Sequence, residues 1–309
     1  MKLAVVGNVN ADLLVWPVEE LPPPGADQLV ESMEIRAAGG AGNTALALAA
    51  LGRPPLLAGC VGEDHFGKFI LESLSTAGVA TDHVTIVPKA RTGISIALEA
   101  PGRDRSFLTF SGSLERFNLS MVPMEEIRSS DLLLLCGYFN LTALRGRPAR
   151  QLLLEARSAG SLTLFDSDWD LHGWTREARK EVADLLPLVD IFLPNEDEAR
   201  MLTGLSDQEA AACRLQRISG GWVVVKLGRE GCLAVGPTGK HRVPAPRTRA
   251  RDTTGAGDAF NGGLMFALSS GIGWKDSLRF ATRLASEVVS RPSHDRYPSA
   301  EEVNKEVDR

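Results

Sequence analysis

The chain carries at residues 252–264 the stretch DTTGAGDAFNGGL, in which two glycines precede an apolar helix pattern. Gly255 and Gly257 permit a tight turn whose N–H groups point one way, and a helix that starts near Asp258 adds the positive end of its dipole. With Ala256 between them, these glycines predict a binding site for an anion such as a phosphate. Asp258 lies at its mouth, where a carboxylate can take the proton of an attacking hydroxyl group. The alternative is a structural role in which Asp258 only caps the helix.

Around this stretch, apolar runs alternate with helical patterns. The runs are continuous, as in buried strands of a parallel sheet, and cover Leu3–Val6, Leu56–Ala58, Leu132–Cys136, Leu162–Phe165, Ile191–Leu193 and Val223–Val225. The helical patterns cover Asn43–Leu51, Phe66–Ala77, Arg150–Ala159, Glu177–Leu185, Glu196–Leu202, Asp258–Ser270 and Ser277–Ser290. This alternation predicts an α/β fold with helices on both faces of a mostly parallel sheet, and ligands at the carboxyl ends of its strands.

Two segments interrupt the alternation. Residues 13–36 contain a proline-rich loop and a strand-like run, and residues 92–111 contain two strand-like runs around a turn at 101–104. A few inserted strands cannot form a second core, so we expect a small sheet that covers the cleft as a lid, within one domain spanning residues 1–309. The exposed edges of such a sheet favour pairing with a second copy of the chain.

A second glycine-rich stretch, AGGAGNTA, occupies residues 38–45 and leads into an Ala/Leu-rich helix. Gly39 and Gly40 permit close approach of the backbone, and Asn43 supplies a donor and an acceptor beside them. Neutral polar groups of this kind suit a hydroxylated ligand. A tight loop in which Asn43 caps the helix explains the same residues.

The stretch GNVNAD at residues 7–12 follows the first predicted strand. Asp12 could accept hydrogen bonds from two sugar hydroxyl groups, with Asn10 beside it. The alternative is an Asx turn that leaves the strand. The glycine pattern GxGxxG is absent at this position, which argues against a dinucleotide-dependent oxidoreductase.

Asn195 and Glu198 follow the strand Ile191–Leu193 and share one face of the next helix. An amide and a carboxylate there could hold water molecules around Mg²⁺, which keeps much of its hydration shell. An acidic helix N-terminus accounts for the same residues without a metal.

Lys226, Gly228 and Gly231 end the buried strand Val223–Val225. A nucleotide could rest on this loop with Lys226 near its phosphates. A hairpin turn is the alternative.

Composition and charge argue against several classes of protein. The 309 residues carry a formal net charge of −5, which gives no electrostatic basis for binding nucleic acid. The four cysteines form no CxxC pair, the N-terminus becomes polar too early for a signal peptide, and no apolar run approaches the length of a membrane span. We expect a soluble cytoplasmic protein that does not bind membranes.

Taken in order, these stretches resemble the ribokinase or PfkB family of carbohydrate kinases over nearly the whole chain. The similarity is strongest at GGAGNTALALAALG (39–52) and DTTGAGDAFNGGL (252–264), with NEDEARMLTG and VVVKLGREG between them. The resemblance implies a ribokinase-like three-layer α/β/α fold with a β lid.

The resemblance also implies roles for individual residues. Asp258 would be the catalytic base, and Gly255, Ala256 and Gly257 the anion hole for the transferred phosphoryl group. The sugar would contact Asn10, Asp12, Gly39, Gly40 and Asn43. ATP would contact Asn195, Lys226, Gly228, Gly231 and Thr282, and Glu198 would govern Mg²⁺ placement, through water.

Some stretches depart from the family pattern. Asp252 and Thr254 match the first half of its monovalent-cation site, but residues 290–297 lack the glycine of the second half, so activation by K⁺ is open. Lys226 stands where ribokinases proper often have a small hydroxyl residue, and FDSDWD (165–170) resembles the FDxN segment of other members without its proline. Arg103 and Arg105, at or beside the lid turn, either face solvent or reach an acidic sugar.

Three functions follow as hypotheses. The first is an ATP-dependent kinase that phosphorylates a primary hydroxyl of a small sugar. The second is a nucleoside kinase of the same superfamily, which the small number of aromatic residues weakly disfavours. The third is a non-catalytic sugar-binding protein, which should have lost the base or the glycine-rich anion site.

Overall fold

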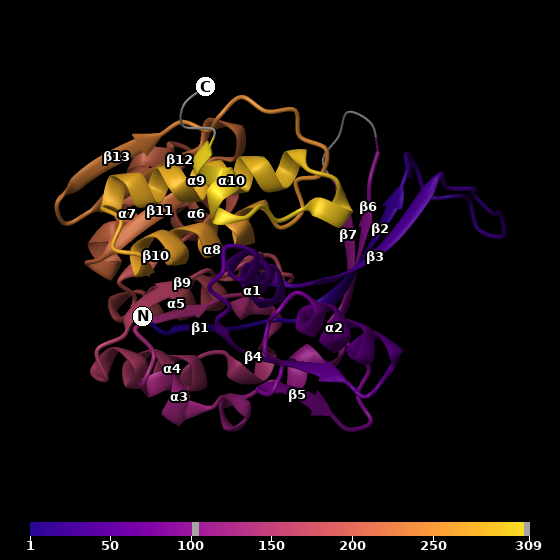
Figure 1. The fold of residues 1–309 in the computed structure, drawn as a ribbon, viewed down its shortest axis with the longest axis horizontal. Helices are drawn as coiled ribbons and strands as arrows, with labels where there is room; N and C mark the ends of the chain where they lie inside the picture. The colour runs from indigo at the N-terminus through magenta and orange to yellow at the C-terminus, as the bar shows by residue number, and fades with distance from the viewer. Residues whose placement is uncertain (101–104, 306–309) are drawn as a thin grey trace.

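A nine-stranded sheet forms the middle of the molecule in the computed structural model, which describes residues 1–100 and 105–305 (Figure 1). The predicted lid turn at 101–104, with Arg103, lies outside the described residues. The strand order is β13-β12-β11-β10-β9-β8-β1-β4-β5, in which the strands from β11 to β5 run parallel and β12 and β13 form an antiparallel hairpin at one edge. The strands are β1 (Leu3–Val6), β4 (Leu56–Gly62), β5 (Val84–Val87), β8 (Leu132–Leu135), β9 (Leu162–Phe165), β10 (Ile191–Phe192), β11 (Trp222–Lys226), β12 (Cys232–Gly236) and β13 (Gly239–Val243).

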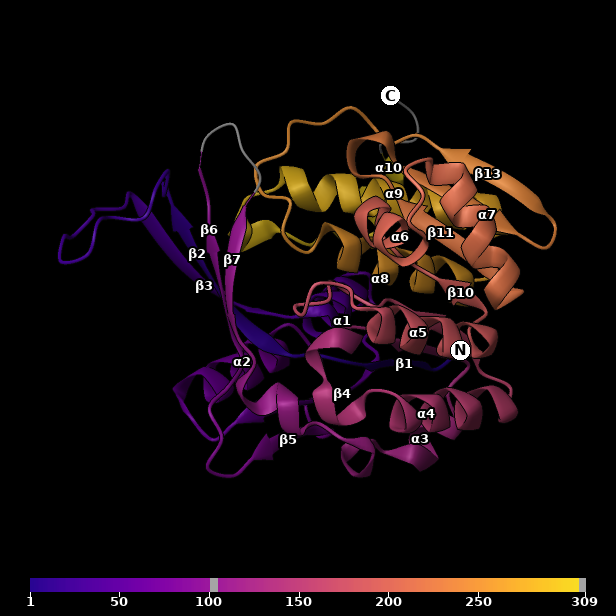
Figure 2. The same ribbon diagram turned by 180° about the vertical axis from the view of Figure 1, so that it is seen from behind.

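Helices cover both faces of this sheet (Figures 1 and 2). Successive strand residues point to opposite faces, so Val5 packs against one layer of helices while Ala4 and Val6 pack against the other. The first layer holds α1 (Gly40–Ala50), α2 (His65–Thr76), α8 (Ala256–Ser269) and α9 (Trp274–Ser290). The second holds α3 (Met124–Arg128), α4 (Arg147–Ser158), α5 (Arg176–Leu185), α6 (Glu196–Thr203) and α7 (Gln208–Ser219), and α10 (Ala300–Lys305) packs on α9. The predicted three-layer α/β/α fold is confirmed.

The helix α1 begins earlier than the sequence predicts. The prediction starts it at Asn43, but its first residue is Gly40, preceded by Gly39 with a φ of 89°. Glycines count against a helix in a sequence pattern, yet here they are needed, because a Cβ atom on Gly39 would lie 2.4 Å from the Asn8 carbonyl oxygen. The interpretation of Asn43 as the cap of this helix is therefore wrong, and its side chain is available for another contact.

A four-stranded sheet projects from one side of the body (Figures 1 and 2). Its order is β3-β2-β6-β7, with β2 (Asn10–Trp16) antiparallel to β3 (Ser32–Ala38) and parallel to β6 (Ile94–Leu98), and β7 (Ser106–Phe110) antiparallel to β6. We call this sheet the lid. Asp12 is the third residue of β2, so the interpretation of Asp12 as part of an Asx turn is wrong.

The two faces of the lid differ in polarity. The strand register aligns Asp12 with Arg36 on β3 and Ser95 on β6, and this row faces the body. The next row, on the opposite face, consists of Leu13, Ile35, Ile96 and Leu108. Ile35 and Leu108 are exposed while Leu13 and Ile96 are half-buried, so the outer face of the lid is apolar and partly exposed.

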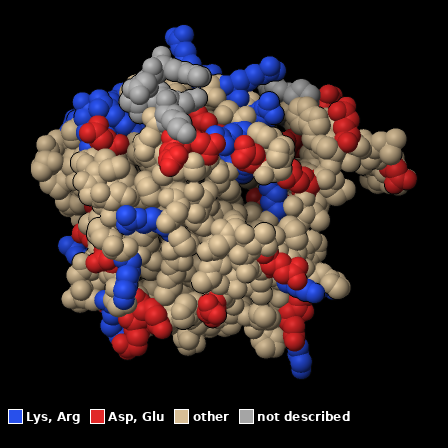
Figure 3. Space-filling view, viewed as in Figure 1, with Lys and Arg blue, Asp and Glu red and all other residues tan. Residues whose placement is uncertain are grey.

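Acidic and basic side chains are mixed on the face of the molecule shown in Figure 3. Among the described residues, no helix combines the length and the apolar character that crossing a membrane requires.

Candidate active site

Two cavities of about 550 Å³ each flank the first turn of α8. The lid cavity lies between lid and body, and its lining includes Asn10, Asp12, Gly39, Gly40, Asn43, Thr254, Gly255 and Asp258. The hairpin cavity lies beside the turn between β11 and β12, and its lining includes Lys226, Gly228, Gly231, Ala256, Gly257 and Thr282. The residues expected to contact a sugar thus surround one cavity, and most of those expected to contact a nucleotide surround the other.

Asp258 lies in the first turn of α8, on the lid cavity. Its Oδ2 accepts a hydrogen bond of 2.9 Å from Nδ2 of Asn43, and it makes no side-chain cap to the helix. Burial raises the pKa of Asp258 to about 7, although the hydrogen bond from Asn43 lowers it. The carboxylate therefore faces a cavity with a pKa that suits proton transfer near neutral pH.

The turn before Asp258 depends on its glycines. Gly255 has a φ of 68°, a conformation that residues with a Cβ atom rarely adopt, and a Cβ atom there would lie 3.0 Å from Asn43. A Cβ atom on Gly257 would lie 3.2 Å from Nζ of Lys226. The amide of Ala256 donates to the Thr253 carbonyl at 3.3 Å, whereas the next amide groups of the first turn have no partner within the helix and could bind an anion beside this turn.

The floor of the lid cavity is a chain of amide and carboxylate groups. Asn8 Oδ1 accepts from the Gly40 amide at 3.0 Å, and Asn8 Nδ2 donates to Asn10 Oδ1 at 3.2 Å. Asn10 Nδ2 in turn donates to Asp12 Oδ1 at 2.9 Å. Burial raises the pKa of Asp12 to about 7. These contacts fix the positions of several amide and carboxylate groups on the lid cavity, where they could form hydrogen bonds with the hydroxyl groups of a ligand.

Lys226 connects the hairpin cavity to a buried carboxylate that the sequence analysis left without a role. Its Nζ lies 2.6 Å from Oδ2 of Asp166, which also accepts a 2.6 Å hydrogen bond from Asn261. Burial lowers the pKa of Lys226, but Asp166 and Glu198 outweigh this effect and hold it above its ordinary value. Lys226 therefore stays cationic next to Gly257.

Asn195 and Glu198 begin α6 as a reciprocal capping box. Glu198 Oε2 accepts from the Asn195 amide at 2.9 Å, and Asn195 Oδ1 accepts from the Glu198 amide at 2.8 Å. Burial raises the pKa of Glu198, and Asp166 raises it further. Neither Asn195 nor Glu198 lines the two cavities, although Asn195 pairs with Lys226 in a β-bridge. Among the described residues no group of three or more His, Cys, Asp or Glu side chains is arranged to hold a metal ion.

The sequence suggested either a hairpin turn or a nucleotide-binding loop after Lys226, and the two are compatible in one segment. β11 and β12 form a hairpin, and its turn is the short 3₁₀ helix Gly228–Glu230, which lines the hairpin cavity. Thr282 lies on α9 and also lines this cavity.

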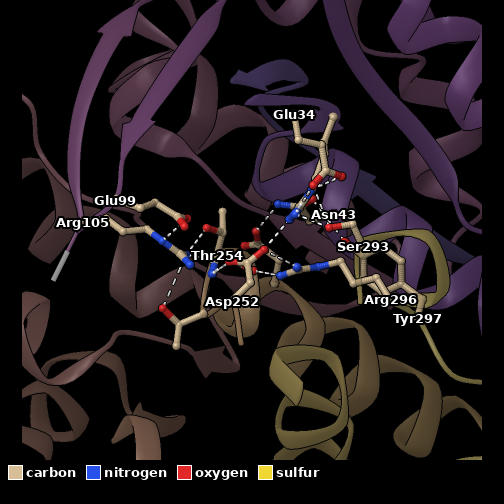
Figure 4. Close-up of polar contacts among 12 residues, drawn as sticks. Glu34, Asn43, Glu99, Arg105, Asp252, Thr254, Ser293, Arg296 and Tyr297 are labelled. Atoms are coloured by element: carbon tan, nitrogen blue, oxygen red, sulfur yellow. Dashed lines mark hydrogen bonds and ion pairs between the residues drawn. The ribbon is translucent and has the colours of Figure 1, made fainter. Parts of the chain in front are cut away.

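Asp252 is surrounded by arginines (Figure 4). Arg36 from the lid and Arg296 from the C-terminal segment both contact Oδ2, the latter at 2.6 Å, and Arg105 lies 2.7 Å from Oδ1. The amide of Thr254 also donates to Oδ1, at 2.8 Å. Burial alone would raise the pKa of Asp252, but these arginines outweigh it and hold the pKa well below its ordinary value.

Arg105 is paired within the protein. Its Nε lies 2.5 Å from Glu99, and its guanidinium also donates to Thr254. The sequence suggested that Arg105 either faces solvent or reaches an acidic sugar, and neither description is complete. The side chain lines the lid cavity, and its charge is matched by the carboxylates of Glu99 and Asp252.

Sequence reasoning missed Tyr297, Arg296 and Asn8. The hydroxyl of Tyr297 donates to Asn43 Oδ1 at 3.2 Å, so that the amide of Asn43 presents its Nδ2 to Asp258 (Figure 4). The stretch 290–297 stood out only because it lacks the glycine of the family pattern. No local signal links Tyr297 to a residue 254 positions earlier in the chain.

Comparisons with known proteins agree with this geometry. Residues 1–299 match the family model described as pfkB family carbohydrate kinase. The chain is 30% identical over 246 residues to the aminoimidazole riboside kinase of Salmonella typhimurium, covering 78% of this chain and 76% of that protein. It is 29% identical over 310 residues to the ribokinase of Haemophilus influenzae, covering 97% and 96%.

A solved structure shares the whole architecture. The structure of Arabidopsis thaliana ribokinase complexed with ribose and ATP superposes with a TM-score of 0.84 at 27% identity, covering 98% of this chain and 97% of that one. The chain therefore belongs to the pfkB family of carbohydrate kinases, and it is a phosphotransferase that has an alcohol group as acceptor.

Proposed function

We propose that the protein transfers the γ-phosphoryl group of ATP to a primary hydroxyl group of a small sugar or sugar derivative, with Asp258 as the general base. The observation that carries this proposal is the position of Asp258 between the two cavities. Its side chain lines the lid cavity, while Ala256 and Gly257, just before it, line the hairpin cavity. An acceptor in the first cavity and a phosphate donor in the second would meet at this turn.

On the acceptor side, the chain binds and orients hydroxyl groups. Asp12 and Asn10 would accept hydrogen bonds from the sugar, with Asn43 and the backbone at Gly39 and Gly40 completing its surroundings. Their positions are set by contacts that exist without ligand, so little ordering is needed on binding.

Asp258 would take the proton of the attacking hydroxyl. With a pKa of about 7, a large share of the enzyme carries the carboxylate at neutral pH, and the base is strong enough to accept a proton in the transition state. The amides of Gly255, Ala256 and Gly257 would stabilise charge on the transferred group.

On the nucleotide side, the hairpin cavity is large enough for a ligand of nucleotide size. ATP would supply the phosphoryl group, and Mg²⁺ would offset charge on its phosphates. Lys226 would lie near the phosphates, and Gly228, Gly231 and Thr282 would line the nucleotide. Asn195 and Glu198 would act through water molecules around the metal.

A nucleoside is the second candidate acceptor, and one observation favours it. Phe107 and Trp169 line the lid cavity with exposed fractions of 52% and 42%. Aromatic rings left in water at the mouth of a polar cavity could stack on a planar base attached to the sugar. The small number of aromatic residues in the chain is therefore a weaker argument against a nucleoside acceptor, since two of them line this cavity.

We also propose that residues 1–309 form a single kinase domain and that two copies pair through the outer face of the lid. The apolar row of Leu13, Ile35, Ile96 and Leu108 supports pairing, because burying it would remove apolar surface from water. All four cysteines are free thiols, which supports a reducing compartment such as the cytoplasm.

An ADP-release screen tests the activity. ATP and Mg²⁺ are supplied with ribose, fructose, ketodeoxygluconate, adenosine or cytidine in turn, and thermal shift with each acceptor reports binding. ADP release with a sugar supports the first candidate, and release only with nucleosides supports the second. Binding without ADP release from any acceptor would favour a non-catalytic protein.

The variant Asp258→Asn tests the base. We expect turnover to fall by about two to four orders of magnitude while ATP binding changes little. Asp276→Asn is a matched control, because Asp276 lies in the first turn of α9 and is exposed, paired with Arg279 at 2.8 Å. Undiminished turnover of Asp258→Asn would refute the assignment.

A further inference from the structure

Arg296 reaches from the C-terminal segment into the loop that precedes the predicted anion site (Figure 4). The residue is only 7% exposed. One guanidinium nitrogen donates to Asp252 Oδ2 at 2.6 Å, and the other donates to the carbonyl oxygen of Thr254. A single side chain therefore holds both residues that the family resemblance assigns to a monovalent cation.

The surroundings of Asp252 and Thr254 do not fit K⁺. A potassium ion needs oxygen atoms that are free to coordinate it, but both carboxylate oxygens of Asp252 accept from arginines. The Thr254 carbonyl accepts from Arg296 as well. The guanidinium groups that converge here would also repel a cation at close range.

The held carbonyl has a direct consequence for the next residue. In a trans peptide the C=O of Thr254 and the N–H of Gly255 point in opposite directions in one plane. Arg296 holds the Thr254 carbonyl pointing toward its guanidinium, and the N–H of Gly255 must then point away from that guanidinium. The left-handed conformation of Gly255 then leads into the first turn of α8.

We propose that the guanidinium of Arg296 takes the place of a monovalent cation, so that the kinase needs no K⁺ to hold its anion site in shape. The inference rests on the proposed function, in which the amides of Gly255, Ala256 and Gly257 receive the phosphoryl group. Arg296 is a positioning residue, since it contacts Asp252 and the Thr254 carbonyl and none of these three amides. The guanidinium is part of the chain, so this support does not depend on a bound ion.

The first experiment compares KCl with choline chloride at matched ionic strength in the wild-type protein. ADP release should be the same in both salts. Arg296→Ala should lose turnover by about ten- to a hundredfold in choline chloride, because a small displacement of the amides costs that much. KCl should restore part of the loss, since the vacated oxygens then become available to the ion.

Thermal unfolding gives a readout that does not depend on catalysis. KCl should raise the Tm of Arg296→Ala above its value in choline chloride, because an ion that binds the native state stabilises it. The wild-type Tm should be equal in the two salts. If no acceptor gives ADP, the proposed function fails, but this comparison still tests the cation replacement.

Arg291→Ala serves as the matched control. Arg291 belongs to the same C-terminal region and pairs with Asp295 and Glu302, away from Asp252. It should respond to K⁺ as the wild type does. Activation or stabilisation of the wild type by K⁺ over choline would overturn the proposal, even if Arg296→Ala does not fold. So would full, K⁺-independent turnover of Arg296→Ala.

Discussion

Asp252 and Asp258 are six residues apart in one loop and helix, yet their surroundings are opposite. Asp252 contacts three arginines, which keep its pKa far below the ordinary value. Among the residues that the structure describes, the carboxylate of Asp258 has the neutral amide of Asn43 as its hydrogen-bond partner, and burial raises its pKa to about 7. A charged partner keeps a carboxylate ionised and held in ion pairs, a structural role. Burial without such a partner raises the pKa and makes the carboxylate a candidate base.

The largest expected difference between the two residues is in stability. Asp252→Asn should lower the free energy of unfolding at pH 8 by about 3 to 5 kcal/mol, because it leaves buried arginines without their partner. Chemical denaturation followed by circular dichroism measures this.

Asp258→Asn is the counterpart under the same conditions. The folded-state pKa of Asp258 is raised, so its stabilising effect is complete below about pH 4 and is lost as the pH rises through about 7. At pH 8 the buried carboxylate is charged, which lowers the free energy of unfolding, and asparagine carries no such charge. The variant should therefore be at least as stable as the wild type. Equal losses in both variants would contradict the distinction between a structural carboxylate and a base.

A smaller expected effect concerns the pH dependence of catalysis. Because the base works only when deprotonated, kcat/KM should fall by about tenfold per pH unit below pH 7. The profile from pH 5.5 to 8.5, with saturating ATP and Mg²⁺, checks this. A profile that stays flat down to pH 5.5 would mean that no carboxylate with a raised pKa acts as the base.

The smallest expected effect comes from Tyr297→Phe. Without the hydroxyl, the amide of Asn43 can turn away from Asp258, and a hydrogen bond that lowers the pKa of Asp258 is weakened. Turnover should fall by about fivefold, the equivalent of one hydrogen bond, and the inflection of the pH profile should move upward.

Tyr138→Phe is the control for this change. The hydroxyl of Tyr138 contacts Glu181 and the Gly146 amide, and Tyr138 is not among the residues that line the lid cavity. The variant should lose stability without moving the inflection. An unmoved inflection in Tyr297→Phe would show that Asn43 keeps its orientation by other contacts.

The sequence allowed the strands of the body to be predicted closely, because each is a short continuous apolar run. β1 and β9 have the predicted bounds, and β10 differs by one residue. The edge strands β5 and β13 were not predicted, since polar or exposed residues break their apolar runs. β12 was also not predicted, although it lies inside the sheet and is mostly buried.

For the candidate site, the sequence allowed predictions where the residues are neighbours in the chain. In the stretch around Gly255–Asp258, glycines and a carboxylate lie close together in the sequence, so a local pattern was enough to nominate it. The contacts of Arg296 with Asp252 and of Tyr297 with Asn43 were not predicted, because they join segments 44 and 254 residues apart. Spacing predicts contacts within one helix, as between Asn195 and Glu198, but not between segments this far apart in the chain.

The lid and the loop before α8 share one carboxylate, since Arg36 and Arg105 reach Asp252 from β3 and from the start of β7. A ligand that displaced the lid strands would therefore also disturb the ion pairs of the loop before α8. Through this shared carboxylate, a change in the position of the lid would be transmitted to the start of α8.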